Sequence, residues 1–182
     1  MNYSCKGKIL VSTPDISGDI FSRSVVLMID HNENGAFGLI LNKKNKETSQ
    51  NLQKIFNFRV DIYEGGPVES NQFFFIIKGQ KITEEYVEID KRFYLTQDMD
   101  SVVSAITDGD IGISDVKIFS GYSGWGAFQL DNEIRRKIWT VVDIYNLDYT
   151  LPNNQNLWKN IMQNLGGGFL LWANAPEDVS MN

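Results

Sequence analysis

Cysteine is nearly absent from this 182-residue sequence, in which Cys5 is the only one. No disulfide can form within the chain, which is typical of a protein kept in a reducing compartment. Only Lys6 and Lys8 lie near Cys5 in the sequence to lower the pKa of its thiol. A reactive thiol is therefore the less favoured interpretation.

Histidine is equally scarce, since His31 is the only one. His31 and Glu33, together with Glu64 or Glu69, are the side chains that could ligate a metal ion. One histidine without a cysteine cluster makes a zinc site the less favoured interpretation, and a loop histidine held by the hydrogen bonds of a turn the favoured one. We therefore expect no metal and no cofactor.

Long hydrophobic runs are missing as well. The longest, such as Val25–Ile29 and Phe73–Ile77, fall far short of the roughly 20 residues that a membrane helix needs. The N-terminus also lacks the apolar stretch of a signal peptide. We expect a soluble protein in the cytoplasm that does not associate with membranes.

Excess positive charge is lacking too, because the formal net charge is −6 and the isoelectric point is about 4.8. Proteins that bind nucleic acid usually carry a basic surface patch, so direct DNA binding is disfavoured. Two short basic clusters, Arg135–Lys137 and the group Lys43, Lys44 and Lys46, are interpreted as solvated surface.

The sequence does contain enough apolar material for a packed core. Hydrophobic residues make up 42% and charged residues 22% of the chain, which is typical of a folded protein. The length suits a single domain over residues 1–182, since no repeat or linker interrupts it. Val25–Ile29 and Phe73–Ile77 are continuously apolar, which predicts strands covered on both faces.

Turn residues and periodicity divide the chain into strands and helices. We expect strands at Lys8–Thr13, Val25–Ile29, Phe37–Leu41, Val60–Tyr63, Gln72–Lys78, Val87–Ile89, Phe93–Leu95, Asp115–Ser120 and Trp139–Ile144. We expect helices at Ser49–Phe56 capped by Ser49, Met99–Thr107 capped by Asp98, Ala127–Lys137 and Leu157–Leu165, then a short apolar return at Phe169–Trp172. The dipeptide Asn34-Gly35 predicts a hairpin with its loop over His31–Gly35. Hairpin connections without strict β-α-β alternation predict the α+β class with a mixed, largely antiparallel sheet.

The stretch Gly121–Gly126, Gly-Tyr-Ser-Gly-Trp-Gly, stands between a strand-like run and a helical pattern. We therefore predict a glycine turn that joins a strand to a helix. Backbone N–H groups at such a helix start could bind a phosphate or carboxylate, in a site lined by Tyr122, Trp125 and Gln129. The structural alternative is that the glycines let Trp125 pack against the sheet.

Ser123 gives the same stretch a partial likeness to the Gly-x-Ser-x-Gly nucleophile elbow. The spacing differs because Trp125 occupies the fifth position, and His31 would have to serve as the base. A serine hydrolase is therefore disfavoured, and the enzyme class as a whole stays open.

Several stretches together resemble one bacterial family. They are Gly7–Pro14, Phe21–Val26, His31–Asn42, Gly65–Val68, Gly121–Gly126 with Gln129–Leu130 and Glu133–Ile134, and Trp172–Asp178. These stretches span nearly the whole chain and resemble the AlgH-like, or YqgE-type, proteins of unknown function. The resemblance implies a cytosolic bacterial protein with an α+β fold, in which a bifurcated sheet curls into a pseudo-barrel with flanking helices. It implies no agreed catalytic residues, and the family's name implies a part in transcriptional control.

The sequence and the resemblance together favour a non-enzymatic protein that binds another protein and has a regulatory role. The alternative is a protein that binds a small molecule, a phosphate or another anion, or an enzyme, at the Gly121–Gly126 stretch and the Gly65-Gly66-Pro67 turn. The residues that we expect at such a ligand site are His31, Asn32, Gly65, Gly66, Tyr122, Ser123, Gly124, Trp125 and Gln129.

Overall fold

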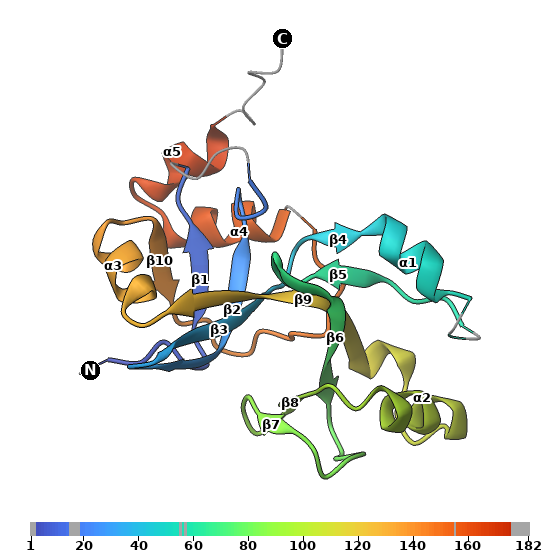
Figure 1. Ribbon diagram of the computed structural model, residues 1–182. Helices are drawn as coiled ribbons and strands as arrows, with labels where there is room; N and C mark the ends of the chain where they lie inside the picture. Colours follow the sequence, from blue (N-terminus) through green and yellow to red (C-terminus); the bar gives the residue numbers. More distant parts are fainter. Residues whose placement is uncertain (1–2, 15–18, 55, 57, 155, 176–182) are drawn as a thin grey trace.

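The computed structural model describes residues 3–14, 19–54, 56, 58–154 and 156–175, which form strands and helices in mixed order (Figure 1). The strands are β1 (Ile9–Ser12), β2 (Val25–Asn32), β3 (Gly35–Ile40), β4 (Lys44–Asn45), β5 (Ile62–Glu64), β6 (Val68–Lys78), β7 (Val87–Glu88), β8 (Phe93–Thr96), β9 (Val116–Gly126) and β10 (Trp139–Val142). The helices are α1 (Lys46–Leu52), α2 (Met99–Asp108), the 3₁₀ turn η1 (Ile113–Asp115), α3 (Gln129–Arg135), α4 (Asn156–Leu165) and α5 (Phe169–Asn174).

These strands join one branched sheet. Its main path runs β10-β1-β2-β3-β9-β6-β8-β7, and β5 with β4 leaves this path as a side branch at β9. Every pairing is antiparallel except the parallel one between β5 and β9. In Figure 1, β9 crosses the middle of the molecule and connects the β1–β3 part of the sheet to β6. The predicted α+β class with a largely antiparallel, bifurcated sheet is confirmed.

The branch forms because β9 changes partners along one of its edges. Its residues Ile118–Ser120 pair with β5, whereas Ser123–Gly126 pair with β3. Between them Gly121 adopts a φ of +67°, and a Cβ atom there would lie 2.6 Å from the carbonyl oxygen of Gly66. Only glycine fits this point, because the backbone crosses closely and φ is left-handed.

Three hydrophobic clusters lie against the sheet. The first packs α4 and α5 on the sheet and contains Leu27 and Phe74. The second packs α1 and α2 on the opposite face of β6 and β9 and contains Phe75. The third lies under α3 and contains Met28. Adjacent residues of β2 and of β6 therefore face different clusters, which confirms that both strands are covered on both faces.

The Gly121–Gly126 stretch is not the predicted turn. It is the second half of β9, which runs to Gly126, and α3 begins only at Gln129. Pairing with β3 and with β6 overrides the turn preference of the glycines. The loop of the β2–β3 hairpin is also shorter than predicted, because β2 extends to Asn32 and pairs it with Gly35.

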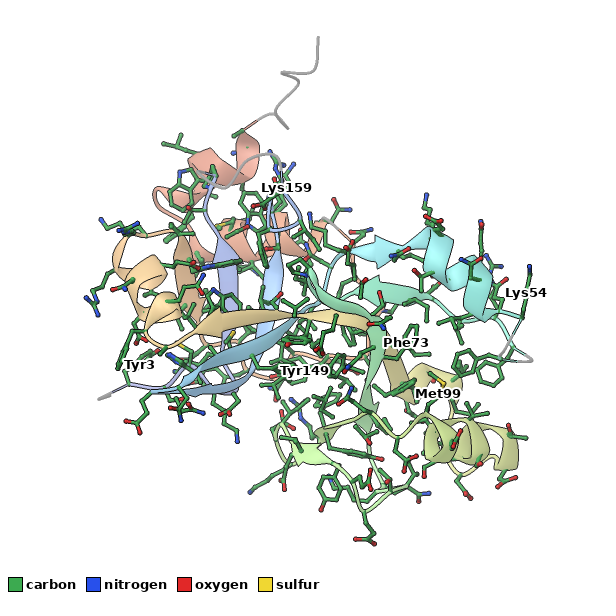
Figure 2. All side chains as sticks on the ribbon, viewed as in Figure 1. Tyr3, Lys54, Phe73, Met99, Tyr149 and Lys159 are labelled. Atoms are coloured by element: carbon green, nitrogen blue, oxygen red, sulfur yellow. The ribbon has the colours of Figure 1, made fainter. Side chains whose placement is uncertain are left out.

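Helix α2 agrees closely with its prediction. The Asp98 side chain accepts a hydrogen bond from the backbone N–H of Ser101 at 3.1 Å, as an N-cap does. Figure 2 labels Met99 at the start of this helix and Phe73 on the neighbouring strand β6, and both pack at the edge of the second cluster.

The prediction for α1 was wrong in detail. The cap of α1 is Asn45 rather than Ser49, whose hydroxyl instead donates to the Asn45 carbonyl and accepts from Ile62 N–H. Residue 55 of the predicted helix lies outside the described residues. The apolar return at Phe169–Trp172 is helical and forms most of α5.

The last long helix, α4, buries Trp158, Ile161 and Met162 in the core. Trp158 of α4 is 1% exposed, and its indole N–H donates to the carbonyl of Ser12 on β1 at 2.8 Å. The Arg23 guanidinium lies 5.1 Å from the centre of the same ring. No helix in the part of the chain that the structure describes is long and apolar enough to cross a membrane.

Candidate functional site

Two adjoining hollows open where the β2–β3 hairpin meets β9 and β6. The first has a volume of about 440 Å³, and its lining includes Asp30, Asn32, Phe37, Tyr122, Gly124 and Trp125. The second has a volume of about 520 Å³, and its lining includes Lys6, Phe37, Phe74, Glu85, Tyr86 and Val87. Because Asp30 and Phe37 line both, we name the combined surface the aromatic trough.

Three rings from three strands form the floor of the aromatic trough. The ring centre of Phe37 on β3 lies 4.8 Å from that of Tyr122 on β9 and 5.5 Å from that of Phe74 on β6. Phe74 and Tyr122 complete the contact at 5.8 Å. Phe37 and Tyr122 are only half-buried, so the floor presents aromatic surface to whatever occupies the hollow.

Glycine explains how Tyr122 reaches Phe37. Gly124 is the residue of β9 that pairs directly with Phe37. A Cβ atom on Gly124 would lie 3.1 Å from the Tyr122 ring. The missing side chain therefore leaves the space over β9 that the Tyr122 ring occupies.

Polar side chains surround this aromatic floor, and their charge is mostly negative. Asp30 accepts hydrogen bonds from the His31 backbone N–H at 2.9 Å and from the Asn32 side chain at 3.1 Å, which fixes its carboxylate at the rim. Glu85 adds a second acidic group, and Lys6 is the basic one. A partner that carries positive charge matches this rim better than an anion does.

The residues predicted from the sequence fall into two groups. Asn32, Tyr122, Gly124 and Trp125 line the aromatic trough. The remaining ones are not part of its lining and serve packing or hydrogen bonding elsewhere; they are His31, Gly65, Gly66, Ser123 and Gln129.

Gly65 and Gly66 lie at the branch of the sheet, where the β5–β6 connection presses against β9. A Cβ atom on Gly66 would lie 2.1 Å from the carbonyl carbon of Tyr122. Ser123 is fully buried there and donates its hydroxyl hydrogen to the carbonyl of Gly65 at 3.0 Å. The Ser123 hydroxyl is thus a structural donor, without the exposed position of a nucleophile elbow.

His31 is a structural link between distant parts of the chain. Its Nδ1 accepts a hydrogen bond from the backbone N–H of Cys5 at 3.0 Å, which leaves the proton of the neutral ring on Nε2. Nε2 lies 3.4 Å from a carboxylate oxygen of Asp131 on α3. Within the described residues no cluster of three or more His, Cys, Asp or Glu side chains is arranged to hold a metal.

Burial and the charge of Asp131 raise the pKa of Cys5 to about 11, with burial the larger cause. The thiol therefore stays protonated near neutral pH, and the thiolate that would react with electrophiles is scarce. This agrees with the interpretation of Cys5 as unreactive.

Gln129 and Trp125 belong to a network that fixes α3 to the sheet. The Glu133 carboxylate accepts hydrogen bonds from the indole N–H groups of Trp125 at 2.8 Å and Trp139 at 2.9 Å. Gln129 donates to the same carboxylate at 3.0 Å and accepts from the backbone N–H of Gly126. The alternative in which glycines let Trp125 pack against the sheet agrees with this arrangement, since Trp125 is 7% exposed.

Lys117 carries a buried amine, and it is not among the site residues predicted from the sequence. It lies on β9 and is only 3% exposed. Its Nζ donates to the carbonyl oxygens of Leu41 at 2.7 Å and Leu151 at 2.8 Å, and lies 4.1 Å from the centre of the Tyr63 ring. The one sequence signal is a lysine inside the apolar run Val116–Phe119.

A separate cleft of about 280 Å³ contains Lys117 in its lining. The other residues of this lining that carry polar groups are Arg59, Asp61, Tyr63, Ser114 and Thr150. None of them lines the aromatic trough. We name this second surface the Lys117 cleft.

Taken together, the fold is that of an α+β protein whose curled, largely antiparallel sheet forms a half-barrel with helices packed against it. The chain matches the family model described as AlgH-like over residues 9–170, and it belongs to this family. This confirms the resemblance to the AlgH-like family.

Relatives and solved structures agree with this assignment. A UPF0301 protein of Cytophaga hutchinsonii is 34% identical over 97% of this chain and 98% of its own length. A UPF0301 protein of Parabacteroides distasonis is 35% identical over 97% of this chain and 91% of its own. The solution structure of the AlgH protein from Pseudomonas aeruginosa has a TM-score of 0.72 at 24% identity and covers 97% of this chain and 96% of its own. A crystal structure from Corynebacterium diphtheriae has a TM-score of 0.73 at 21% identity and covers 96% of this chain and 94% of its own. These two structures share the fold, and no specific function follows from any of the matches.

Proposed function

We propose that the protein is a non-enzymatic binding protein whose aromatic trough takes an extended segment of a partner protein. The observation that carries the proposal is the contact of the half-buried rings of Phe37 and Tyr122 with the buried ring of Phe74 at two adjoining hollows. Aromatic side chains surrounded by a polar rim are typical of the central part of protein interfaces. A regulatory role would then act through the bound partner.

The edge of the sheet supports an extended segment as the occupant. Among the described residues β7 pairs only with β8, so its other edge is open, and Val87 of β7 and the preceding Tyr86 line the trough. Both are substantially exposed, at 40% and 47%. A peptide strand could add its backbone hydrogen bonds to this edge and place alternate side chains on the aromatic floor.

The charge of the rim selects among partners. Asp30 and Glu85 would attract a segment that contains arginine or lysine and would repel a phosphate or a carboxylate. Since the Gly121–Gly126 stretch is a strand, it also provides no helix start for an anion. A small anionic ligand is therefore the weaker candidate for the trough, and direct DNA binding weaker still.

Selection of binding peptides from a random displayed library tests this proposal. We expect sequences that combine basic residues with aromatic or aliphatic ones. Binding should fall at least about tenfold on Phe37→Ser and on Tyr86→Ser, because each removes apolar contact from the trough.

Tyr145→Ser is the matched control, because Tyr145 is an exposed tyrosine, at 88%, outside the trough. Its peptide affinity should equal that of the unmodified protein. Selected peptides that bind all three variants equally, or a selection that yields only acidic sequences, would refute the assignment of the trough.

A further inference from the structure

The Lys117 cleft combines features that neither packing nor the proposed protein binding requires. Lys117, which carries a primary amine, is among the residues that line a cleft of about 280 Å³ near the middle of the sheet. Burying an ammonium group is costly unless it is fully paired, and lysine is seldom retained in such a position without a reason. The pocket opens beside the exposed side chains of Arg59 and Asp61.

We propose that Lys117 forms an imine with the carbonyl group of a small aldehyde or ketone that also carries a carboxylate or a phosphate. The neutral amine attacks the carbonyl carbon, and the N–C bond forms as the carbonyl π electrons move to oxygen. The carbinolamine then loses its oxygen as water, which takes both amine hydrogens, and a C=N bond remains. One carbonyl compound and one amine give one imine and one water, so no oxidant or reductant is needed.

The environment of Nζ supplies neutral amine at neutral pH. Burial lowers the pKa of Lys117 from 10.5 to about 7, against an opposing effect from the charge of Asp148. The Tyr63 ring acts in the same direction as Asp148, because its π face favours the charged ammonium form. Tyr63 itself stays a neutral phenol, because burial, with a smaller effect from Asp61, raises its pKa to about 12. Asp61 itself is paired with Lys44 at 2.8 Å.

The hydrogen bonds of Nζ fit a neutral amine. Such an amine has two N–H groups and one lone pair, and Leu41 and Leu151 offer two carbonyl acceptors. Both N–H groups can therefore stay bonded while the lone pair remains available for attack. Imine formation breaks these bonds. The imine nitrogen then takes one proton from water, and the resulting single N–H can bond to one of the two carbonyls again.

The polar side chains that line the cleft indicate which carbonyl compounds would bind. The Arg59 side chain is exposed there and, within the described chain, has no hydrogen bond or ion pair. A guanidinium in this state can bind a carboxylate or a phosphate in a bidentate manner. Ser114 and Thr150 add hydroxyl groups for a polar ligand.

Reductive trapping tests the proposal on the full-length protein at pH 7. The probes are glyoxylate, pyruvate and glyceraldehyde 3-phosphate, each with cyanoborohydride, and propanal is the probe without an acidic group. We expect an adduct at Lys117, located by peptide mass analysis, beside the one that the N-terminal amine forms because its pKa is about 8. At pH 7 an ordinary lysine has roughly a thousandfold smaller neutral fraction, so surface lysines should react far more slowly.

Variants separate ligand binding from a structural role. Lys117→Met should abolish the adduct, whereas Lys159→Met, at an exposed lysine on α4, should leave it unchanged. Arg59→Gln should slow trapping of the acidic probes about tenfold or more and leave that of propanal unchanged, because only the acidic probes use the guanidinium.

Trapping in the unmodified protein keeps the test decisive even if Lys117→Met fails to fold. If Lys117 serves only to link the carbonyls of Leu41 and Leu151, no probe should modify it faster than surface lysines. That result, or adducts spread evenly over the lysines, would overturn the proposal. The aromatic trough plays no part, so Phe37→Ser should trap normally whether or not peptides bind.

Discussion

The buried amine of Lys117 makes the stability of the fold depend on pH. Its pKa is about 7 in the folded protein, against an ordinary value of 10.5. Between these values the unfolded chain binds more protons than the folded one, so the free energy of unfolding rises with pH across this window. Each pH unit contributes about 1.4 kcal/mol.

We predict that the free energy of unfolding of the unmodified protein, relative to that of Lys117→Met, increases by about 3 kcal/mol between pH 6.5 and pH 9. Methionine keeps the length of the side chain and removes the titrating group. Urea denaturation of both proteins at several pH values measures the difference, since other groups titrate alike in the two.

Lys159→Met is the control for removal of a surface lysine. The difference in free energy of unfolding between it and the unmodified protein should not change with pH. Figure 2 labels Lys159 on α4, where it is exposed. A difference between Lys117→Met and the unmodified protein that does not change with pH would show that Lys117 stays charged in the fold.

Single residues also mark what the sequence could and could not predict. It favoured an unreactive Cys5, and the raised pKa of the buried thiol agrees with that interpretation. It could not assign the partners of Lys117, since Leu41 and Leu151 are far from it along the chain and offer only backbone carbonyls. A lysine inside an apolar run is a signal of burial, but its acceptors are set by tertiary structure.

At the scale of elements, β9 organises both candidate surfaces. It contributes Tyr122 to the aromatic trough and Lys117 to the Lys117 cleft. The apolar run before Ser120 predicted its first half correctly. Its second half was mistaken for a turn, because three glycines usually indicate one. Here Gly121 and Gly124 instead allow a close backbone crossing and room for the Tyr122 ring, and both depend on distant residues.

The branch at β9 gives a prediction for Gly66→Ala. The added methyl carbon would lie 2.1 Å from the carbonyl carbon of Tyr122 and 2.3 Å from the backbone nitrogen of Ser123, so backbone must move. We expect a loss of about 1–3 kcal/mol in the free energy of unfolding, as for overpacked cores. Urea denaturation measures it.

Gly168→Ala is the matched glycine control, because nothing lies within 4 Å of its Cβ position. Its effect should stay within about 0.5 kcal/mol. If Gly66→Ala were equally harmless, the connection between β5 and β6 would be free to move away from β9, and the branch would not constrain the strand.

At the scale of the whole molecule, a single sheet contributes residues to all three hydrophobic clusters, which lie on different sides of it. The four tryptophans of the chain all belong to the first and third clusters, as Trp125, Trp139, Trp158 and Trp172. The second cluster contains no tryptophan among the described residues. Tryptophan fluorescence therefore reports on one part of the molecule, whereas far-ultraviolet circular dichroism reports on all of it.

That the chain behaves as one domain remains a prediction, and Phe75→Ala tests it. Phe75 is fully buried in the second cluster and its strand, β6, is paired with β9. Because β9 also pairs with β3 on the tryptophan side, a loss of about 3–5 kcal/mol should lower the unfolding midpoint equally by fluorescence and by circular dichroism. If this variant does not fold, Phe75→Leu gives the same comparison with a smaller loss. An unchanged fluorescence midpoint beside an early transition in circular dichroism would mean that β9 links two units that unfold independently.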